Sequence, residues 1–88
     1  PGTWTVEALL RTSLEEAGRH VPATTATLEA VPEGVLLRCE VEDLDRCAHL
    51  LAGLPFALAV RRPPELRAAL EQLAERVRQL AASAGAAR

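Results

Sequence analysis

The sequence predicts an α+β fold in which a four-stranded antiparallel sheet carries two helices on one face and a long helix follows. Two observations lead to this prediction. Hydrophobic residues recur with a period of two in some segments and with helical spacing in others, and the two kinds of segment alternate along the chain. The length of 88 residues predicts one domain, with a core over about residues 3–62 and a C-terminal helix over about 64–83.

The first strand and helix are predicted from alternation and from a capping signal. One face of the strand carries Trp4, Val6, Ala8 and Leu10. Ser13 and Glu16 have the spacing of a capping box, in which each side chain satisfies a free backbone N–H of the other. Gly18 is the predicted stop of this short helix, which should end before Pro22.

A hairpin is predicted next. The second strand places Ala26, Leu28 and Ala30 inward, and Pro32–Gly34 provides a turn. The third strand shows the clearest alternation, with one face made by Val35, Leu37, Cys39 and Val41. We expect Cys39 and Cys47 to act as small core hydrophobes, because free cysteine is usually buried.

The second helix and fourth strand complete the sheet. Asp43 caps a helix predicted over Leu44–Ala52, and Gly53 ends it. The following strand is nearly apolar on both sides: Phe56, Leu58 and Val60 face one way, and Ala57, Ala59 and Arg61 the other. Such a composition predicts a strand with little water on either face.

The order β-α-β-β-α-β, followed by a long helix, predicts a ferredoxin-like split βαβ sandwich. Its second sheet face would remain open. That face would carry Thr5, Glu7, Leu9, Thr25, Thr27, Glu29, Leu36, Arg38 and Glu40.

Composition argues against several functions. Twelve acidic residues outnumber ten arginines, and no lysine is present, so a broad phosphate-binding surface is not expected. The only aromatic residues besides histidine, Trp4 and Phe56, fall on the inward face, unlike the base-stacking residues of an RNA reader. His20 and His49 lack a partner in fixed register, and Cys39 and Cys47 lack metal-ligand spacing. We therefore expect no enzyme activity, metal or cofactor. No apolar run is long enough to span a membrane, and we expect a cytoplasmic protein.

Several segments, taken in order, resemble the C-terminal extension domain of WYL-type bacterial transcription regulators, the WCX domain. They are "GVLLRCEV", "EDLDR", "LLAGLP" and "AVRRPPELR", followed by an amphipathic helix; upstream, "VEALLRTSLEEAGRHVP" resembles the family's opening strand and helix. The resemblance implies that the chain is the C-terminal part of a larger regulator. Such a regulator would contact DNA only through a helix-turn-helix domain outside this sequence. This module would serve oligomerisation and coupling to the WYL domain.

The C-terminal helix carries the predicted interface. Its apolar residues are spaced four and three apart, as in a coiled-coil seam: Leu66, Leu70, Leu73, Val77 and Leu80. At 1.5 Å per residue the helix is longer than a strand of ordinary length, so its end should extend past the sheet. We expect the seam or the open sheet face to bind a second subunit or the WYL domain, and predict a homodimer. In the simpler alternative, the first half covers the domain's own core and the rest frays.

A second function remains open on the sheet face. Small ferredoxin-like domains also act as ligand sensors of the ACT type, which bind a metabolite between two copies. Glu7, Arg38 and Glu40 would supply converging polar groups for such a ligand. The simpler interpretation of these residues is a cross-strand ion pair on a solvated face.

Overall fold

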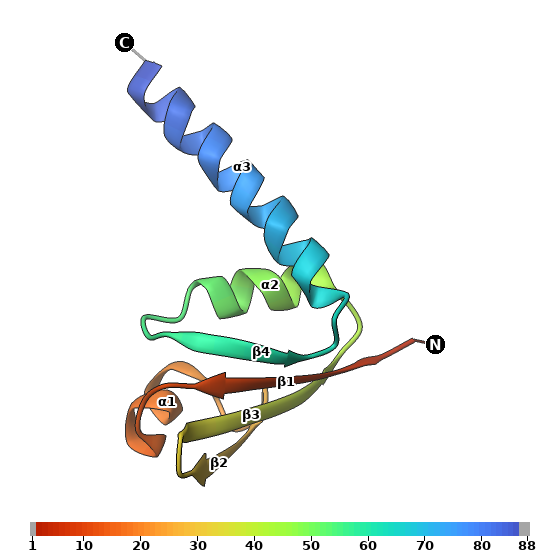
Figure 1. The fold of residues 1–88 in the computed structure, drawn as a ribbon, viewed down its shortest axis with the longest axis vertical. Coiled ribbons are helices and arrows are strands. Elements are labelled where there is room, and N and C mark those ends of the chain that lie inside the picture. The colour runs from red at the N-terminus through yellow and green to blue at the C-terminus, as the bar shows by residue number, and fades with distance from the viewer. Residues whose placement is uncertain (1, 87–88) are drawn as a thin grey trace.

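A computed structural model describes residues 2–86 and confirms the predicted order of elements (Figure 1). Four strands and three helices follow one another as βαββαβα. Their bounds are β1 Trp4–Leu10, α1 Leu14–His20, β2 Thr27–Val31, β3 Gly34–Val41, α2 Leu44–Ala52, β4 Leu58–Arg62 and α3 Leu66–Ala86.

The four strands form one antiparallel sheet in the order β2-β3-β1-β4. Strand β3 forms the hairpin with β2 and also pairs with β1. The second pairing covers the full length of β1, from Trp4 opposite Val41 to Leu10 opposite Val35. This order places β1 and β3 in the centre and leaves β2 and β4 at the edges. The predicted ferredoxin-like arrangement is therefore confirmed.

Helices α1 and α2 cover the same face of the sheet, and each has its own buried cluster beneath it. Under α1, Ala17 and Val21 pack against Leu10 and Leu37. Under α2, Ala48 and Leu51 pack with Val6 of β1 and with α3. Because α1 has only seven residues, the two helices lie apart on the sheet (Figure 1).

The short helix α1 begins as predicted, continues past Gly18 and ends before Pro22. The Glu16 backbone N–H donates to the Ser13 side-chain oxygen at 3.1 Å. In a capping box the Glu16 carboxylate would accept from the Ser13 backbone N–H, but here it accepts from the Arg19 side chain instead. Gly18 lies inside the helix, so it is not the stop that was predicted, whereas the expected end before Pro22 is confirmed. The helix ends at His20, because Pro22 favours an extended conformation at Val21, which has φ −124° and ψ 106°.

The β2–β3 turn depends on Gly34. Its φ is +150°, and a Cβ atom there would lie 2.2 Å from the Leu10 carbonyl oxygen. Only glycine fits, since both the conformation and the close approach of the end of β1 exclude a side chain. The turn therefore fixes where the hairpin meets β1.

The position of β4 corrects the sequence prediction. Its apolar composition predicted cover on both faces, but β4 is an edge strand whose residues alternate between half-buried and exposed. Pairing with β1 also shifts by one residue: Val60 lies opposite Ala8 but Arg62 lies opposite Glu7. Arg61 is the extra residue of this bulge, and Arg62 is thereby turned to the open sheet face.

Helix α3 starts two residues later than expected. Pro64 and Glu65 form a turn, in which the Leu66 N–H donates to the Pro63 carbonyl oxygen at 3.1 Å. From Leu66 the helix runs for 21 residues and leaves the rest of the fold (Figure 1). The molecule measures 46 × 32 × 21 Å, and the projecting helix runs obliquely to its longest axis (Figure 1). The expected extension past the sheet is therefore found.

Candidate functional site

The structure divides the predicted seam of α3 between core and solvent. Leu66 is fully buried beside α2, and Leu70 and Leu73 are half-buried against the same cluster. Leu66 is thus not available to a partner, which corrects its place in the predicted interface. It is buried because α3 starts beside β4 and α2, where its first turn closes the core.

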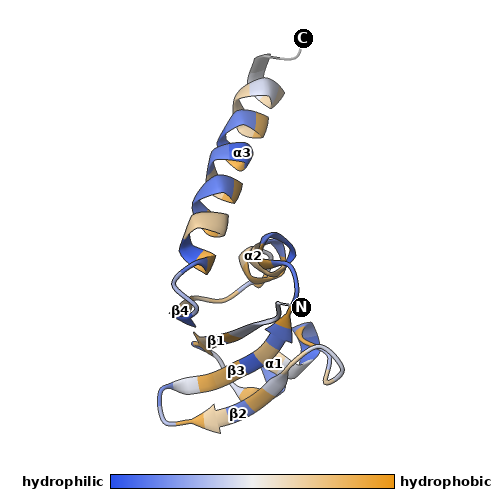
Figure 2. Ribbon diagram, turned by 90° about the vertical axis from the view of Figure 1, so that its right-hand side faces the viewer, coloured by the Kyte–Doolittle hydropathy of each residue, from blue (hydrophilic) through white to orange (hydrophobic). Residues whose placement is uncertain are grey.

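The rest of the seam projects beyond the domain. Val77 is 53% exposed and Leu80 is 54% exposed, and every residue from Ala74 to Gly85 is exposed. Figure 2 shows the hydrophobic residues of α3 along one side of the helix and the hydrophilic residues along the other. We call Leu73, Val77, Leu80 and Ala84 the projecting stripe. Nothing in the described part of the chain covers Val77 and Leu80.

The open sheet face holds the predicted cross-strand ion pair. The Glu7 carboxylate accepts from Arg38 at 2.9 Å and from Arg62 at 2.8 Å, each to the same oxygen. These bonds, with Arg62 first, hold the pKa of Glu7 below its ordinary value of 4.5. Sequence reasoning identified Arg38 but missed Arg62, because the bulge that turns Arg62 onto this face cannot be inferred from alternation.

Glu40 is not part of this cluster. Its carboxylate accepts hydrogen bonds from Thr5 at 2.7 Å and from Thr3 at 3.3 Å. The three residues considered for a sensor site therefore satisfy one another or neighbouring side chains. The geometry is that of the simpler interpretation, ion pairs across a solvated face, and no feature of it favours a ligand.

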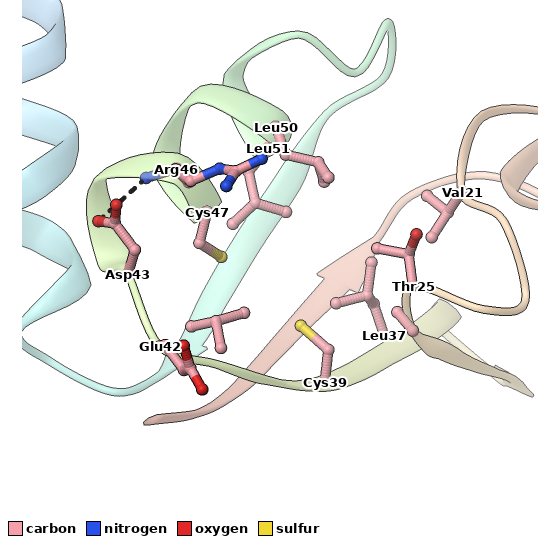
Figure 3. Close-up of a pocket in the computed structure, with 12 residues that line it drawn as sticks. Val21, Thr25, Leu37, Cys39, Glu42, Asp43, Arg46, Cys47, Leu50 and Leu51 are labelled. Carbon is pink, nitrogen blue, oxygen red and sulfur yellow. Dashed lines mark hydrogen bonds between the residues drawn. The ribbon is translucent and has the colours of Figure 1, made fainter. Parts of the chain in front are cut away.

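A cavity of about 670 Å³ lies between α2, β3 and the connection from α1 to β2 (Figure 3). It exists because α1 and α2 lie apart, which leaves part of the sheet uncovered. Its walls are mostly apolar, and Asp43 and Arg46 lie at one end. Cys39 and Cys47 both project into it from different elements (Figure 3).

The Cys39 and Cys47 side chains line the same cavity, a proximity that their separation in sequence did not indicate. Cys47 is buried and Cys39 is half-buried, so the core assignment holds fully only for Cys47. Burial raises the pKa of both thiols, that of Cys47 to about 11. In residues 2–86, no group of three or more His, Cys, Asp or Glu side chains is placed to hold a metal ion.

Neither histidine is arranged as a catalytic base. His49 is exposed, and its Nδ1 lies 2.7 Å from the Asp45 carbonyl oxygen within the same helix. His20 contacts the edge of the Phe56 ring at 5.8 Å between centroids, and its Nε2 lies 3.3 Å from the Glu16 carboxylate. Two of these three contacts lie within a helix, and the third is the packing of the His20 and Phe56 rings.

These features define the class of protein: a small ferredoxin-like α+β module whose last helix presents an uncovered apolar stripe. Its helices, over the described residues, include none long and apolar enough to cross a membrane. A family model for the WCX domain matches residues 4–81, nearly the whole chain. The chain therefore belongs to the WCX domain family, as the resemblance predicted. Neither the curated proteins nor the solved structures compared with it gave a significant match.

Proposed function

We propose that this WCX domain is the non-catalytic C-terminal module of a helix-turn-helix/WYL transcription regulator, where it serves oligomerisation and inter-domain coupling. Membership of the WCX family supports the context. The projecting stripe carries the proposal for assembly, because beyond Leu73 it is an apolar surface that the described part of the domain leaves exposed.

The energetic argument concerns Val77 and Leu80. Full burial of such side chains contributes about 1.5–3 kcal/mol each, and about half of each side chain is still exposed. An isolated helix of about a dozen residues is only marginally stable in water. A partner packed on the stripe would stabilise the helix and bury these side chains together. We propose a second copy of this chain as that partner, so that the module forms a homodimer.

Sedimentation of the chain over a range of concentrations tests this proposal. The wild-type chain should form a dimer at high concentration, and Val77→Glu with Leu80→Glu should remain monomeric, because two carboxylates cannot be buried in an apolar contact. Gln79→Glu with Ala82→Glu is the matched control. It adds the same charge on the opposite side of the helix and should dimerise like the wild type.

Two results together would contradict the role of the stripe. One is a wild-type chain that is monomeric at every concentration. The other is a full-length regulator whose assembly is unchanged by Val77→Glu with Leu80→Glu. In that case Val77 and Leu80 would be exposed surface residues that play no part in assembly.

The non-catalytic part of the proposal rests on the dispersed positions of the histidines and the raised thiol pKa values. We expect the purified chain to show no hydrolase or redox activity and no affinity for duplex DNA at moderate salt, since its net charge is −2. Activity assays and metal analysis of the purified chain check the first expectation, and gel-shift assays with duplex DNA check the second. Stoichiometric zinc, or a micromolar sequence-selective shift, would count against it.

A further inference from the structure

The edge strand β4 has a composition that its position does not explain. Leu58, Ala59 and Val60 form an apolar run typical of a strand covered on both sides, yet β4 lies at an open edge of the sheet. In Figure 2, β4 lies at the margin of the fold with no described element beyond it. An apolar strand at an open edge is a place where another chain can pair with the sheet.

The backbone of β4 offers unused hydrogen-bonding groups at that edge. The Arg11 N–H donates to the Ala57 carbonyl oxygen at 2.9 Å, so Ala57 points its backbone groups toward the β1 side. In an antiparallel pair these directions alternate from residue to residue. Leu58 and Val60 therefore direct their N–H and C=O groups away from β1, where an added strand would find two donors and two acceptors.

A cleft runs beside this edge, between β4 and α3. Its volume is about 630 Å³, and apolar side chains from both elements line it. Leu58 and Val60 contribute from the strand, and Leu70 and Ala74 from the helix. Edge groups and apolar cleft thus lie together, which is the combination by which domains bind an extended peptide as an additional strand.

The charges around the cleft are mainly positive. Arg61 and Arg67 line it against one carboxylate, that of Glu71, and all three residues are exposed. Among the described residues Arg61 makes no ion pair, and Arg67 makes only an exposed one with Glu71 at 3.2 Å. A second copy of β4 would bring the same arginines to this rim, whereas carboxylates on a peptide would complement them.

We propose that the cleft between β4 and α3 binds an extended peptide of alternating apolar and acidic residues, which adds to the sheet at the edge of β4. Its apolar side chains pack against Val60 and Leu70, and its carboxylates pair with Arg61 and Arg67. Pro63 and the bulge at Arg61 interrupt regular pairing, so the paired stretch is short, about three to five residues. The proposal is independent of the projecting stripe, since Val77 and Leu80 lie outside the cleft.

The test uses the ¹⁵N-labelled 88-residue chain at low salt and a capped probe peptide, Glu-Val-Glu-Val-Glu. Saturable chemical-shift changes should be confined to the amides of β4 and the first half of α3, and those of Leu58 and Val60 should move most. Two control peptides separate the contributions. Gln-Val-Gln-Val-Gln lacks the charges and should bind at least about fivefold more weakly. An N-methylated form, which cannot donate to β4, should not bind.

Variants of the chain locate the site. Arg61→Glu with Arg67→Glu should abolish binding of the acidic peptide. Arg76→Glu with Arg78→Glu, which changes the charge equally outside the cleft, should leave it intact. Circular dichroism verifies that each variant is folded. Val77→Glu with Leu80→Glu should bind the peptide normally even if it is monomeric, which keeps this test separate from that of assembly.

Three outcomes would overturn the proposal. The acidic peptide gives no saturable shifts, or it binds no more tightly than the glutamine and N-methylated peptides, or the arginine variants bind as the wild type does. If instead the β4 amides shift with the concentration of the chain itself, the edge pairs with a second copy, and the peptide proposal is equally wrong.

Discussion

The two halves of α3 share one hydrophobic pattern but differ in what covers it. Over Leu66–Leu73 the apolar side packs on α2 and the sheet, and Leu66 is fully buried. Over residues 74–85 the same spacing continues into solvent, and Leu80 is 54% exposed. The comparison teaches that heptad spacing shows which side of a helix is apolar, whereas the partner of that side depends on where the helix starts.

The largest expected effect is a difference in stability between two matched leucine truncations, one in each half of α3. Leu66→Ala should destabilise the chain by about 2–5 kcal/mol, because it opens a cavity in a packed core. Leu80→Ala should change the stability of the monomer by less than about 0.5 kcal/mol, since it lies on an exposed surface. Urea denaturation of both at low protein concentration measures the difference. Similar losses for the two would break the contrast between the halves.

A smaller effect concerns Cys47, which is buried beneath the covered half. Its pKa of about 11 in the folded chain lies above the ordinary value of 9.0, because burial and then the Cys39 side chain disfavour the thiolate. The folded state therefore favours the protonated thiol. This contribution to stability is complete below pH 9 and is lost as the pH rises from 9 toward 11.

Cys47→Ala should reduce the loss of stability in that alkaline range relative to the wild type. Urea midpoints from pH 7 to 10.5 under reducing conditions measure it. Identical alkaline profiles for the two chains would show that Cys47 is as accessible to solvent as the projecting half of α3.

The smallest effect is expected on the open sheet face, which no described helix covers. The folded-state pKa of Glu7 is lowered by Arg62 and Arg38, so its contribution to stability is present above pH 4.5 and is lost as the pH falls through the lowered pKa. Glu7→Gln should lower the melting temperature slightly at pH 7, and the difference should vanish in acid. Glu29→Gln on the same face is the control. A pH-independent difference would mean that packing, and not charge, is responsible.

Much of the fold could be predicted because local signals were unambiguous. The α2 helix runs from Leu44 to Ala52 as predicted, since the Asp43 side chain accepts from the Asp45 N–H and Gly53 follows the last turn. The inward alternation of β1 and β3 is equally clear, and both strands were predicted from it. Local chemistry decides these elements almost alone.

The errors arise where tertiary placement decides. Gly18 is a helix breaker by type, but Pro22 sets the end of α1. The edge position of β4 and its bulge depend on strand order, which brought Arg62 to Glu7. Cys39 and Cys47 line one cavity because β3 passes beneath α2, so no spacing rule indicates their proximity. Of the candidate site, the apolar stripe was predicted, and the burial of its first half was foreseen only in the simpler alternative, in which that half covers the domain's own core.

The length of α3 also makes it a lever. Its 21 residues span about 31 Å, and its buried end is held at Leu66 between the sheet and α2. A tilt of about 10° at that pivot moves the far end by about 5 Å, roughly one helical turn. A small change of packing around Leu66 therefore produces a larger displacement at the far end of α3. A partner bound there would be moved by small changes in the domain's core.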